Sequence, residues 1–456
     1  MEVPRPIAAV REMVDEAARR SPARLTLVAF AGIIAVFTGL LSLPVATVGD
    51  HRTSFVDTLF TAVSAVCVTG LTVVDTGTHW SAFGQAVILL AIWIGGLGVM
   101  TLASILGLAV SRRIGLTQRL LAQAEVGSRG LGEVGSLIRV VVITSLTIQG
   151  GIAALLVPRL LVLGGSAGDA VWHGVFYAVS SFNNAGFVPT ADGLVPYVGD
   201  WWVCLPIALG VFIGSLGFPV IFNLARHGWS FRHLTLHSKL TITTSLALLG
   251  ATTLLVGALE WGNPGTLGEL PVHERVLSMI FAGVMPRSGG FSTIDVGQMH
   301  ESSWLLTDAV MFVGGGSAST AGGIKVTTFA VLLLAILSEA RGDRDMEAFG
   351  RRIPRETLRL AVAVTVVGAV MVLVATLLVL EITSLPLDVV LFEVISAFAT
   401  VGLSTGITPG LDDSAKYVLA VLMFAGRTGT ITVAAALALR DRRRVIRYPE
   451  ERPIIG

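Results

Sequence analysis

The chain has 456 residues, of which 53% are hydrophobic and only 14% are charged, and its mean hydropathy is +0.78. These values are typical of a polytopic membrane protein and exclude a soluble enzyme. The net charge of +1 hides a segregation of basic and acidic side chains between alternate connections of the chain.

Residues 1–23 contain acids and arginines without an apolar core, so we interpret them as a cytoplasmic lead-in and not as a signal peptide. A membrane-spanning helix needs about 20 apolar residues. Eight stretches reach that length: 24–44, 81–110, 138–164, 200–225, 238–260, 303–337, 357–382 and 415–439. The two cysteines, Cys67 and Cys204, lie in apolar stretches and are interpreted as reduced packing residues.

A shorter apolar stretch separates the two spans of each successive pair. These stretches are 54–68, 169–184, 271–287 and 386–400. They are too short to cross a membrane, which is typical of re-entrant helices. The sequence therefore predicts an all-α membrane protein with eight transmembrane helices in four pseudo-symmetric repeats of helix, re-entrant helix and helix. The predicted repeats are 24–113, 137–226, 238–340 and 355–440, followed by a cytoplasmic tail at 441–456.

Basic side chains concentrate in the connections that follow each repeat. They include Arg112, Arg113, Arg119, Arg226, Arg232, Lys239, Arg341, Arg344, Arg351, Arg352, Arg355 and the arginines between 440 and 447. By the positive-inside rule these connections are cytoplasmic, and both termini are expected on the same side. The opposite connections are mainly acidic.

Each re-entrant stretch ends in a related motif: VTGL at 68–71, NAGF at 184–187, SGGF at 288–291 and TVGL at 400–403. Successive glycines, at 70, 186, 290 and 402, are 116, 104 and 112 residues apart. One such glycine is more often a helix-packing residue, but a near-constant period favours a shared role.

Glycine takes positive φ without strain, so four such segments around one central pore can direct carbonyl oxygens at a bare monovalent cation. The C-terminal dipole ends of the short helices add to the attraction. The predicted selectivity filter, with K⁺ at its backbone oxygens, consists of Val68, Thr69, Gly70, Asn184, Ala185, Gly186, Ser288, Gly289, Gly290, Thr400, Val401 and Gly402.

The chain resembles the ion-conducting membrane subunit of the Trk/Ktr/HKT superfamily of potassium transporters, of the Ktr type. The similar motifs are CVTGLTVVDT, SFNNAGF, RSGGFST, SAFATVGLSTG, GGSASTAGGIKVTT and GRTGTITV, and they cover nearly the whole chain. Plant members that favour sodium often have serine at the first filter glycine, whereas Gly70 keeps the potassium pattern.

The resemblance implies potassium uptake across a bacterial cell (inner) membrane by a homodimer. It also implies a separate cytoplasmic ring of RCK-type regulatory subunits, which bind the nucleotide. No covalent cofactor and no nucleic-acid partner are expected, and sodium is a candidate activator.

The predicted sixth span is interrupted by the small-residue run GGGSASTAGGIK at 314–325. Such a run is found at kinks and close helix packing, but its free backbone groups favour a gate lined by protein or water. The resemblance implies an intramembrane loop under the filter that obstructs the pore. The candidate gate residues are Gly314, Gly315, Gly316, Ser317, Ala318, Ser319, Thr320, Ala321, Gly322, Gly323, Lys325 and Arg427.

Three ionisable residues lie in apolar helices, where they are functional candidates. Lys325 is a gate candidate, although it could instead extend to the cytoplasmic interface. Arg427 belongs to the GRTG match, which implies a pore-facing guanidinium that opposes cation passage. Glu393 is interpreted as a brace of the filter scaffold.

Two other classes of protein agree less well with the sequence. An alternating-access secondary transporter is expected to have inverted repeats and acids at the midplane, but here the repeats run parallel and the acids cluster in connections. A membrane-embedded enzyme needs paired acids, a metal cluster or a nucleophile in the helical core, and the sequence has none in a recognisable motif. His227, His233 and His237 lie in a basic connection and are not favoured as metal ligands.

Overall fold

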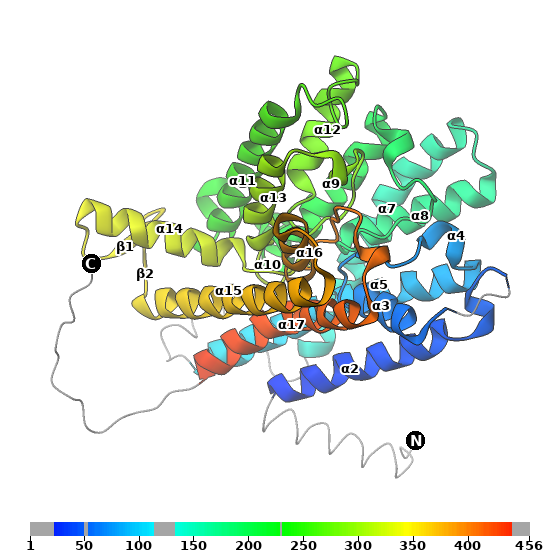
Figure 1. Cartoon of the computed structure of the whole chain (residues 1–456). Coiled ribbons are helices and arrows are strands. Elements are labelled where there is room, and N and C mark those ends of the chain that lie inside the picture. The colour runs from blue at the N-terminus through cyan, green and yellow to red at the C-terminus, as the bar shows by residue number, and fades with distance from the viewer. Residues whose placement is uncertain (1–21, 50–52, 114–132, 229, 440–456) are drawn as a thin grey trace, which may run out of the picture.

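A computed structural model describes residues 22–49, 53–113, 133–228 and 230–439, and in this part of the chain almost all regular structure is helical (Figure 1). The longer helices are α2 (Pro22–Leu41), α5 (Ala82–Arg113), α7 (Glu133–Val162), α11 (Leu236–Glu260), α15 (Arg355–Thr383) and α17 (Asp413–Leu439). Most of the predicted lead-in and the whole predicted tail lie outside the described residues.

Two further predicted spans are each divided into two helices. These are α9 (Trp201–Leu216) with α10 (Phe218–His227), and α13 (Glu301–Phe312) with α14 (Val326–Arg341). The four short apolar stretches form α3 (Phe55–Val66), α8 (Ala167–Phe182), α12 (Val272–Val284) and α16 (Leu387–Phe398). The remaining elements are α4 (Thr76–His79) and the 3₁₀ turns η1 (Pro44–Ala46), η2 (Val195–Tyr197), η3 (Phe231–His233), η4 (Val296–Gln298) and η5 (Thr408–Gly410).

The prediction of a mainly helical protein with several apolar helices is confirmed. Among the described residues, four helices are long and apolar enough to cross a membrane, and the bent pair α9 and α10 would make a fifth. The predicted count of eight stays a prediction. Leucines and valines on α15, such as Val366, Leu373 and Leu377, are more than half exposed, as expected for a surface that faces lipid.

The structure has two features that the predicted all-α repeats do not include. The stretch 200–225 is not one continuous helix, because the chain bends by 99° between α9 and α10. Gly217 makes this bend at φ 90°, and the proline at 219 favours the start of α10. The connection after α14 contains an antiparallel hairpin of β1 (Met346–Ala348) and β2 (Arg351–Ile353), whose turn has positive φ at Phe349 and Gly350.

The helix contacts link the successive stretches of the chain and return from the last to the first. Helix α5 contacts α7 and α8, α9 contacts α11 and α12, α13 contacts α16, and α14 contacts α15. The last helix, α17, contacts α2 and α3 and lies beside α2 in Figure 1. The short helices α3, α8, α12 and α16 are therefore held by helices from neighbouring stretches.

A partly buried ion pair joins the first stretch to the last. Ser54 begins α3, where its Oγ accepts a hydrogen bond from the Asp57 N–H (3.0 Å) and donates to Asp57 Oδ2 (2.8 Å). The other carboxylate oxygen of Asp57 lies 2.8 Å from Lys416 Nζ on α17, and the two side chains are 20% and 10% exposed. The start of α3 is thus fixed to α17.

We expect Lys416→Met to lower the unfolding temperature of the purified protein in detergent, because it leaves the Asp57 carboxylate partly buried without its cation. A hydrogen bond to a charged group contributes about 1.5–3 kcal/mol. The matched control is Arg352→Met, which removes an exposed pair with Asp345 (2.8 Å) and should have little effect. Equal shifts for the two variants would contradict a stabilising role of the pair at Asp57.

Candidate functional site

Three of the four short helices end in the same hydrogen-bonded turn. After α3, the Val68 N–H donates to the Ala65 carbonyl (3.1 Å) and the Thr69 N–H donates to the Ser64 carbonyl (2.8 Å). This pair of bonds is a Schellman motif, which places the first residue of the turn in the left-handed region. The same pair follows α8 at Asn184 and Ala185, and α16 at Thr400 and Val401.

The backbone conformation recurs in all four segments. Each has a non-glycine residue at positive φ and, two residues later, a glycine at positive φ: Val68 (56°) and Gly70 (97°), Asn184 (61°) and Gly186 (70°), Ser288 (70°) and Gly290 (73°), Thr400 (47°) and Gly402 (93°). A β-branched residue such as valine or threonine rarely adopts positive φ. Strain of this kind is concentrated at functional sites.

The four glycines approach one another and their neighbours' carbonyls in a closed cycle. A Cβ on Gly70 would collide with the Ala185 carbonyl oxygen, and one on Gly186 would lie 2.9 Å from the Gly290 Cα. A Cβ on Gly290 would collide with the Val401 carbonyl oxygen, and one on Gly402 with the Thr69 carbonyl oxygen. The structure therefore brings all four predicted filter segments together, with each segment against the next.

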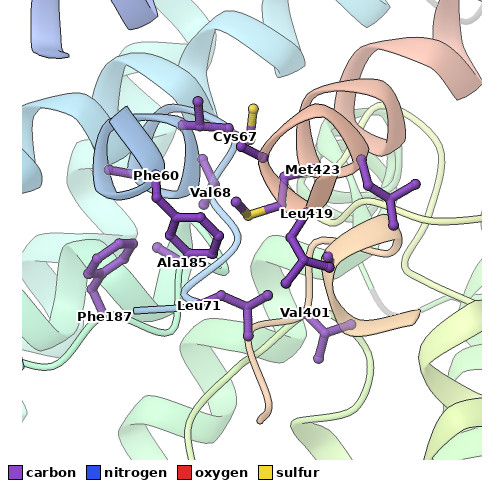
Figure 2. Packing of buried hydrophobic residues seen from close by; sticks show 14 of the residues in the cluster. Phe60, Cys67, Val68, Leu71, Ala185, Phe187, Val401, Leu419 and Met423 are labelled. Carbon is purple, nitrogen blue, oxygen red and sulfur yellow. The ribbon is translucent and has the colours of Figure 1, made fainter. Parts of the chain in front are cut away.

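Buried side chains support these turns from behind. Figure 2 shows Val68 and Leu71 of the first segment packed near Ala185 of the second, Val401 of the fourth and Met423 of α17. Serine hydroxyls hold two of the glycines, because Ser64 Oγ accepts from the Gly70 N–H and Ser396 Oγ from the Gly402 N–H, each at 3.1 Å. Ser180 Oγ donates instead to the Phe187 carbonyl (2.8 Å).

Several polar atoms at the segments are buried and have no hydrogen-bond partner among the described residues. They are the hydroxyls of Thr69 and Thr400 and the amide nitrogen of Asn184. Buried polar atoms in proteins are normally satisfied by protein, water or an ion. Three such atoms therefore lie together at the glycine-containing segments, where protein groups of the described residues do not satisfy them.

The third segment differs from the other three. After α12, the Gly289 N–H donates to the Met285 carbonyl (2.8 Å), so the Schellman pair of the other segments is replaced. A cavity of about 20 Å³, lined in part by Met285, Pro286 and Phe291, lies beside it. Arg287, which is buried, places its guanidinium 5.4 Å from the centre of the Phe212 ring and has no hydrogen-bond partner in the described part of the chain.

Residues 313–325 form a compact loop between α13 and α14. The loop is closed at its base, where the Ile324 N–H donates to the Phe312 carbonyl (3.2 Å) and the Val326 N–H donates to the Gly315 carbonyl (3.0 Å). It is seated on the bend between α9 and α10: the Gly316 N–H donates to the Ser215 carbonyl (2.7 Å) and the Phe218 N–H donates to the Ala318 carbonyl (3.2 Å). The bend at Gly217 thus exposes the backbone groups that bind the loop.

The loop also contacts three of the four segments, and it lies so close to the fourth that a Cβ on Gly322 would collide with the Thr400 hydroxyl. Thr320 Oγ1 lies 3.0 Å from Asn184 Oδ1 in the second segment. Ser288 Oγ in the third segment accepts from the Gly322 N–H (3.2 Å) and donates to the Thr400 carbonyl in the fourth (2.6 Å). The predicted gate run therefore lies directly against the predicted filter.

The two cationic gate candidates both bind the loop. Arg427 on α17 is 1% exposed and donates from Nη1 to the Thr320 carbonyl, whereas its Nε and Nη2 have no partner among the described residues. Lys325 Nζ donates back to the Ala321 carbonyl (2.6 Å) instead of extending away from the loop. Glu393 on α16 accepts from Ser404 Oγ (2.9 Å) and from Thr408, beyond the fourth segment.

The sequence did not predict three contacts of this site: the bridging role of Ser288, the burial of Arg287 and the seat at Gly217. Each depends on residues at least 34 positions away, and no local pattern indicates them. Of the histidines, His227 contacts Asn223 and His233 contacts Ser230. In the ranges that the structure describes, no group of three or more histidine, cysteine or acidic residues could hold a metal ion.

Comparison with known proteins gives one family and several close relatives. The profile of a family described as "TrkH: Cation transport protein" matches residues 29–443. The Ktr system potassium uptake protein B of Bacillus subtilis is 38% identical, and the match covers 98% of this chain and 99% of that protein. The Ktr system potassium uptake protein B of Vibrio alginolyticus is 36% identical, and the match covers 95% of this chain and 94% of that protein. The potassium/sodium uptake protein NtpJ of Enterococcus hirae is 34% identical over 96% and 98%.

A solved structure has the same fold. The potassium transporter TrkH from Vibrio parahaemolyticus superposes with a TM-score of 0.69 at 18% identity, covering 89% of this chain and 83% of that chain. At this identity the likeness concerns the fold alone.

We expect Gly402→Ala to destabilise the protein much more than Gly406→Ala does. Both glycines have φ near 95°, so an alanine at either position is destabilised by about 1–2 kcal/mol through its left-handed backbone conformation. Only the Cβ at 402 collides with the Thr69 carbonyl, whereas the Cβ at 406 meets nothing within 4 Å. Unfolding temperatures in detergent would measure the difference, and similar values for both variants would contradict close contact between the first and fourth segments.

Proposed function

Because the chain belongs to the TrkH family of cation transport proteins, we propose that it takes up potassium through a channel-like pore with a selectivity filter of four backbone segments. The family is one of cation transporters and not of enzymes. Its curated relatives are named as potassium or potassium/sodium uptake proteins, and the apolar helices are those of a multi-pass membrane protein.

The cyclic contact of the four glycines is the observation that best supports the filter. Carbonyl oxygens can replace the hydration shell of K⁺ only if several converge at one place. Such convergence requires backbones without intervening side chains, and each glycine meets a neighbouring segment at the distance where a Cβ would collide. In this proposal the K⁺ ligands are the backbone oxygens of 68–70, 184–186, 288–290 and 400–402.

The four short helices add a favourable field. Each ends directly before one of the segments, so its C-terminal dipole end lies toward the proposed pathway. Asp57 and Asp169 are in the first turns of α3 and α8, at the opposite, positive ends of these dipoles. A cation is thus favoured at the segments without a carboxylate as ligand.

The loop 313–325 is the proposed gate. It lies against three segments and is held by backbone bonds to the α9–α10 bend and by Arg427. A guanidinium about 4 Å from a cation repels it by about 4 kcal/mol at an effective dielectric constant near 20. Arg427 would therefore both anchor the loop and oppose the passage of cations until the loop moves.

Control by partners is proposed from the resemblance. The chain would act as a homodimer in the bacterial inner membrane with both termini cytoplasmic. A separate ring of RCK-type subunits would bind a nucleotide and act on the loop from the cytoplasmic side, and sodium would act as an activator. The arginine-rich connections 341–359 offer a basic surface on the side where the ring would dock.

An alternating-access cation transporter is the second candidate. It is favoured by the two interrupted helix pairs, α9 with α10 and α13 with α14, because such transporters bind ions at discontinuous helices. The two candidates differ in their response to gradients. A pore dissipates a potassium gradient alone, whereas a coupled transporter can accumulate potassium against its gradient when a second ion flows down its own.

The central experiment is potassium uptake by liposomes that contain the purified protein, with complementation of a potassium-uptake-deficient bacterium as the test in cells. Both are done with and without a regulatory subunit of this family. We expect uptake that follows the potassium gradient and increases when the regulatory subunit is activated. Absence of potassium flux from correctly folded, dimeric protein would refute the proposed function.

We expect Gly70→Ser to reduce the preference for potassium over sodium while uptake persists. A serine Cβ at this position collides with the Ala185 carbonyl, so both the first and the second segment must shift, and a hydroxyl is added. The measurement is the ratio of potassium to sodium uptake in liposomes. Gly49→Ser is the control, because Gly49 also has positive φ but meets nothing within 4 Å. An unchanged ratio in the Gly70 variant would exclude Gly70 from the filter.

We expect Arg427→Ala to increase potassium flux in the absence of the regulatory ring and to leave the preference for potassium intact. Arg427→Lys should be intermediate, since the charge remains but the planar set of donors is lost. Arg359→Ala, which removes an exposed arginine of α15, should behave as wild type. If the alanine variant at 427 is folded and no faster than wild type, Arg427 is a scaffold residue and not a barrier.

A further inference from the structure

Ser288 occupies an unusual position among the four segments. It is fully buried and has φ 70°. Its hydroxyl makes two hydrogen bonds that join three separate parts of the chain: it accepts from the Gly322 N–H of the loop at 3.2 Å and donates to the Thr400 carbonyl at 2.6 Å. One hydroxyl thus connects the proposed gate to a carbonyl of the proposed filter.

The equivalent residues of the other segments do not make this connection. Val68 has no hydroxyl, and the hydroxyl of Thr400 has no partner among the described residues. The Asn184 side chain accepts a hydrogen bond from the Thr320 hydroxyl of the loop, but within the described ranges it does not bond a backbone oxygen of a neighbouring segment. In the part of the chain that the structure describes, Ser288 is therefore the side chain that bonds both the loop and the backbone oxygen of a neighbouring segment.

We propose that Ser288 is a positioning residue that couples the loop 313–325 to the fourth filter segment, so that displacement of the loop and cation binding at the Thr400 carbonyl change together. This proposal rests on the proposed function. A carbonyl that accepts a 2.6 Å hydrogen bond is held toward its donor, and coordination of a cation competes for the same oxygen. A cation that draws the Thr400 oxygen to the axis weakens the Ser288 bond and with it the attachment of Gly322.

The third segment can move more freely than the others. It lacks the Schellman pair that fixes the other three, and the cavity of about 20 Å³ beside it leaves space for a small shift. By linkage, the effect works in both directions: a loop held closed lowers the affinity for the cation, and a bound cation favours release of the loop by the same factor.

The test measures thiol labelling of a cysteine placed in the loop by Ala318→Cys, a position that is partly exposed. The native Cys67 and Cys204 are buried, so they should react slowly. The rate of labelling by a maleimide is measured on the full-length protein in detergent, in a buffer that contains either choline or potassium as the cation. Ser288→Gly removes the hydroxyl and accepts φ 70° without strain, and Ser288→Ala removes it at the same φ. Both should increase the labelling rate in choline by roughly twofold to tenfold, the range for one hydrogen bond, and reduce its dependence on potassium.

Two further variants separate coupling from general loosening. Ser288→Thr keeps the hydroxyl, and its labelling rate should equal that of wild type, because the equivalent residue Thr400 shows that a threonine is accommodated at positive φ in this turn. Ser396→Ala removes a hydroxyl that holds Gly402 but does not touch the loop, so the labelling rate should not change. In liposomes, Ser288→Gly should also lower the potassium concentration for half-maximal flux.

Labelling rates equal to wild type in both Ser288→Gly and Ser288→Ala would overturn the coupling, as would an equal increase in Ser396→Ala. Labelling does not require transport. Lack of potassium flux in the wild type would therefore refute the proposed function, whereas normal wild-type flux with unaltered labelling would refute the coupling alone.

Discussion

The structure depends on one close backbone approach, in which four glycine-containing segments meet without side chains between them. The Cα atoms of neighbouring segments are so near that a Cβ on Gly186 would lie 2.9 Å from the Cα of Gly290. Such an approach is stable only if each segment enters from a fixed direction. The short helices provide this direction, because three of them end in the same hydrogen-bonded turn and are packed between helices of neighbouring stretches.

The parts of the site that the sequence predicted are those with a special backbone requirement. Positive φ demands glycine at positions such as Gly70 and Gly402, so the near-constant period of these residues predicted four related segments that the structure brings together. The small-residue run at 314–325 likewise interrupts an apolar stretch, and the structure has a loop there. A charged side chain in an apolar helix is energetically costly, so the sequence predicts Arg427 as a candidate functional residue.

The remaining features arise from contacts between distant residues. Nothing near Ser288 in the sequence distinguishes it from an ordinary serine, and its role appears only when residues 322 and 400 are placed beside it. The bend at Gly217 is not predicted, because the apolar stretch 200–225 continues on both sides of it. At this bend the Phe218 N–H has no carbonyl of the preceding helical turn as its acceptor. It donates instead to the Ala318 carbonyl of the loop, which stabilises the bend. The hairpin at 346–353 is too short to leave a strand pattern of its own.

The attachment of the loop 313–325 has a consequence for the synthesis of the protein. The loop's backbone partners on α9 and α10 are made before it, but Thr400 and Arg427 belong to the last quarter of the chain. In the order of synthesis, the third stretch is therefore made before the groups on α16 and α17 that complete its hydrogen bonds. Until α16 and α17 are in place, the Thr320 carbonyl lacks the Arg427 guanidinium and the Ser288 hydroxyl lacks the Thr400 carbonyl, so the last helices to be synthesised complete the packing of the third stretch.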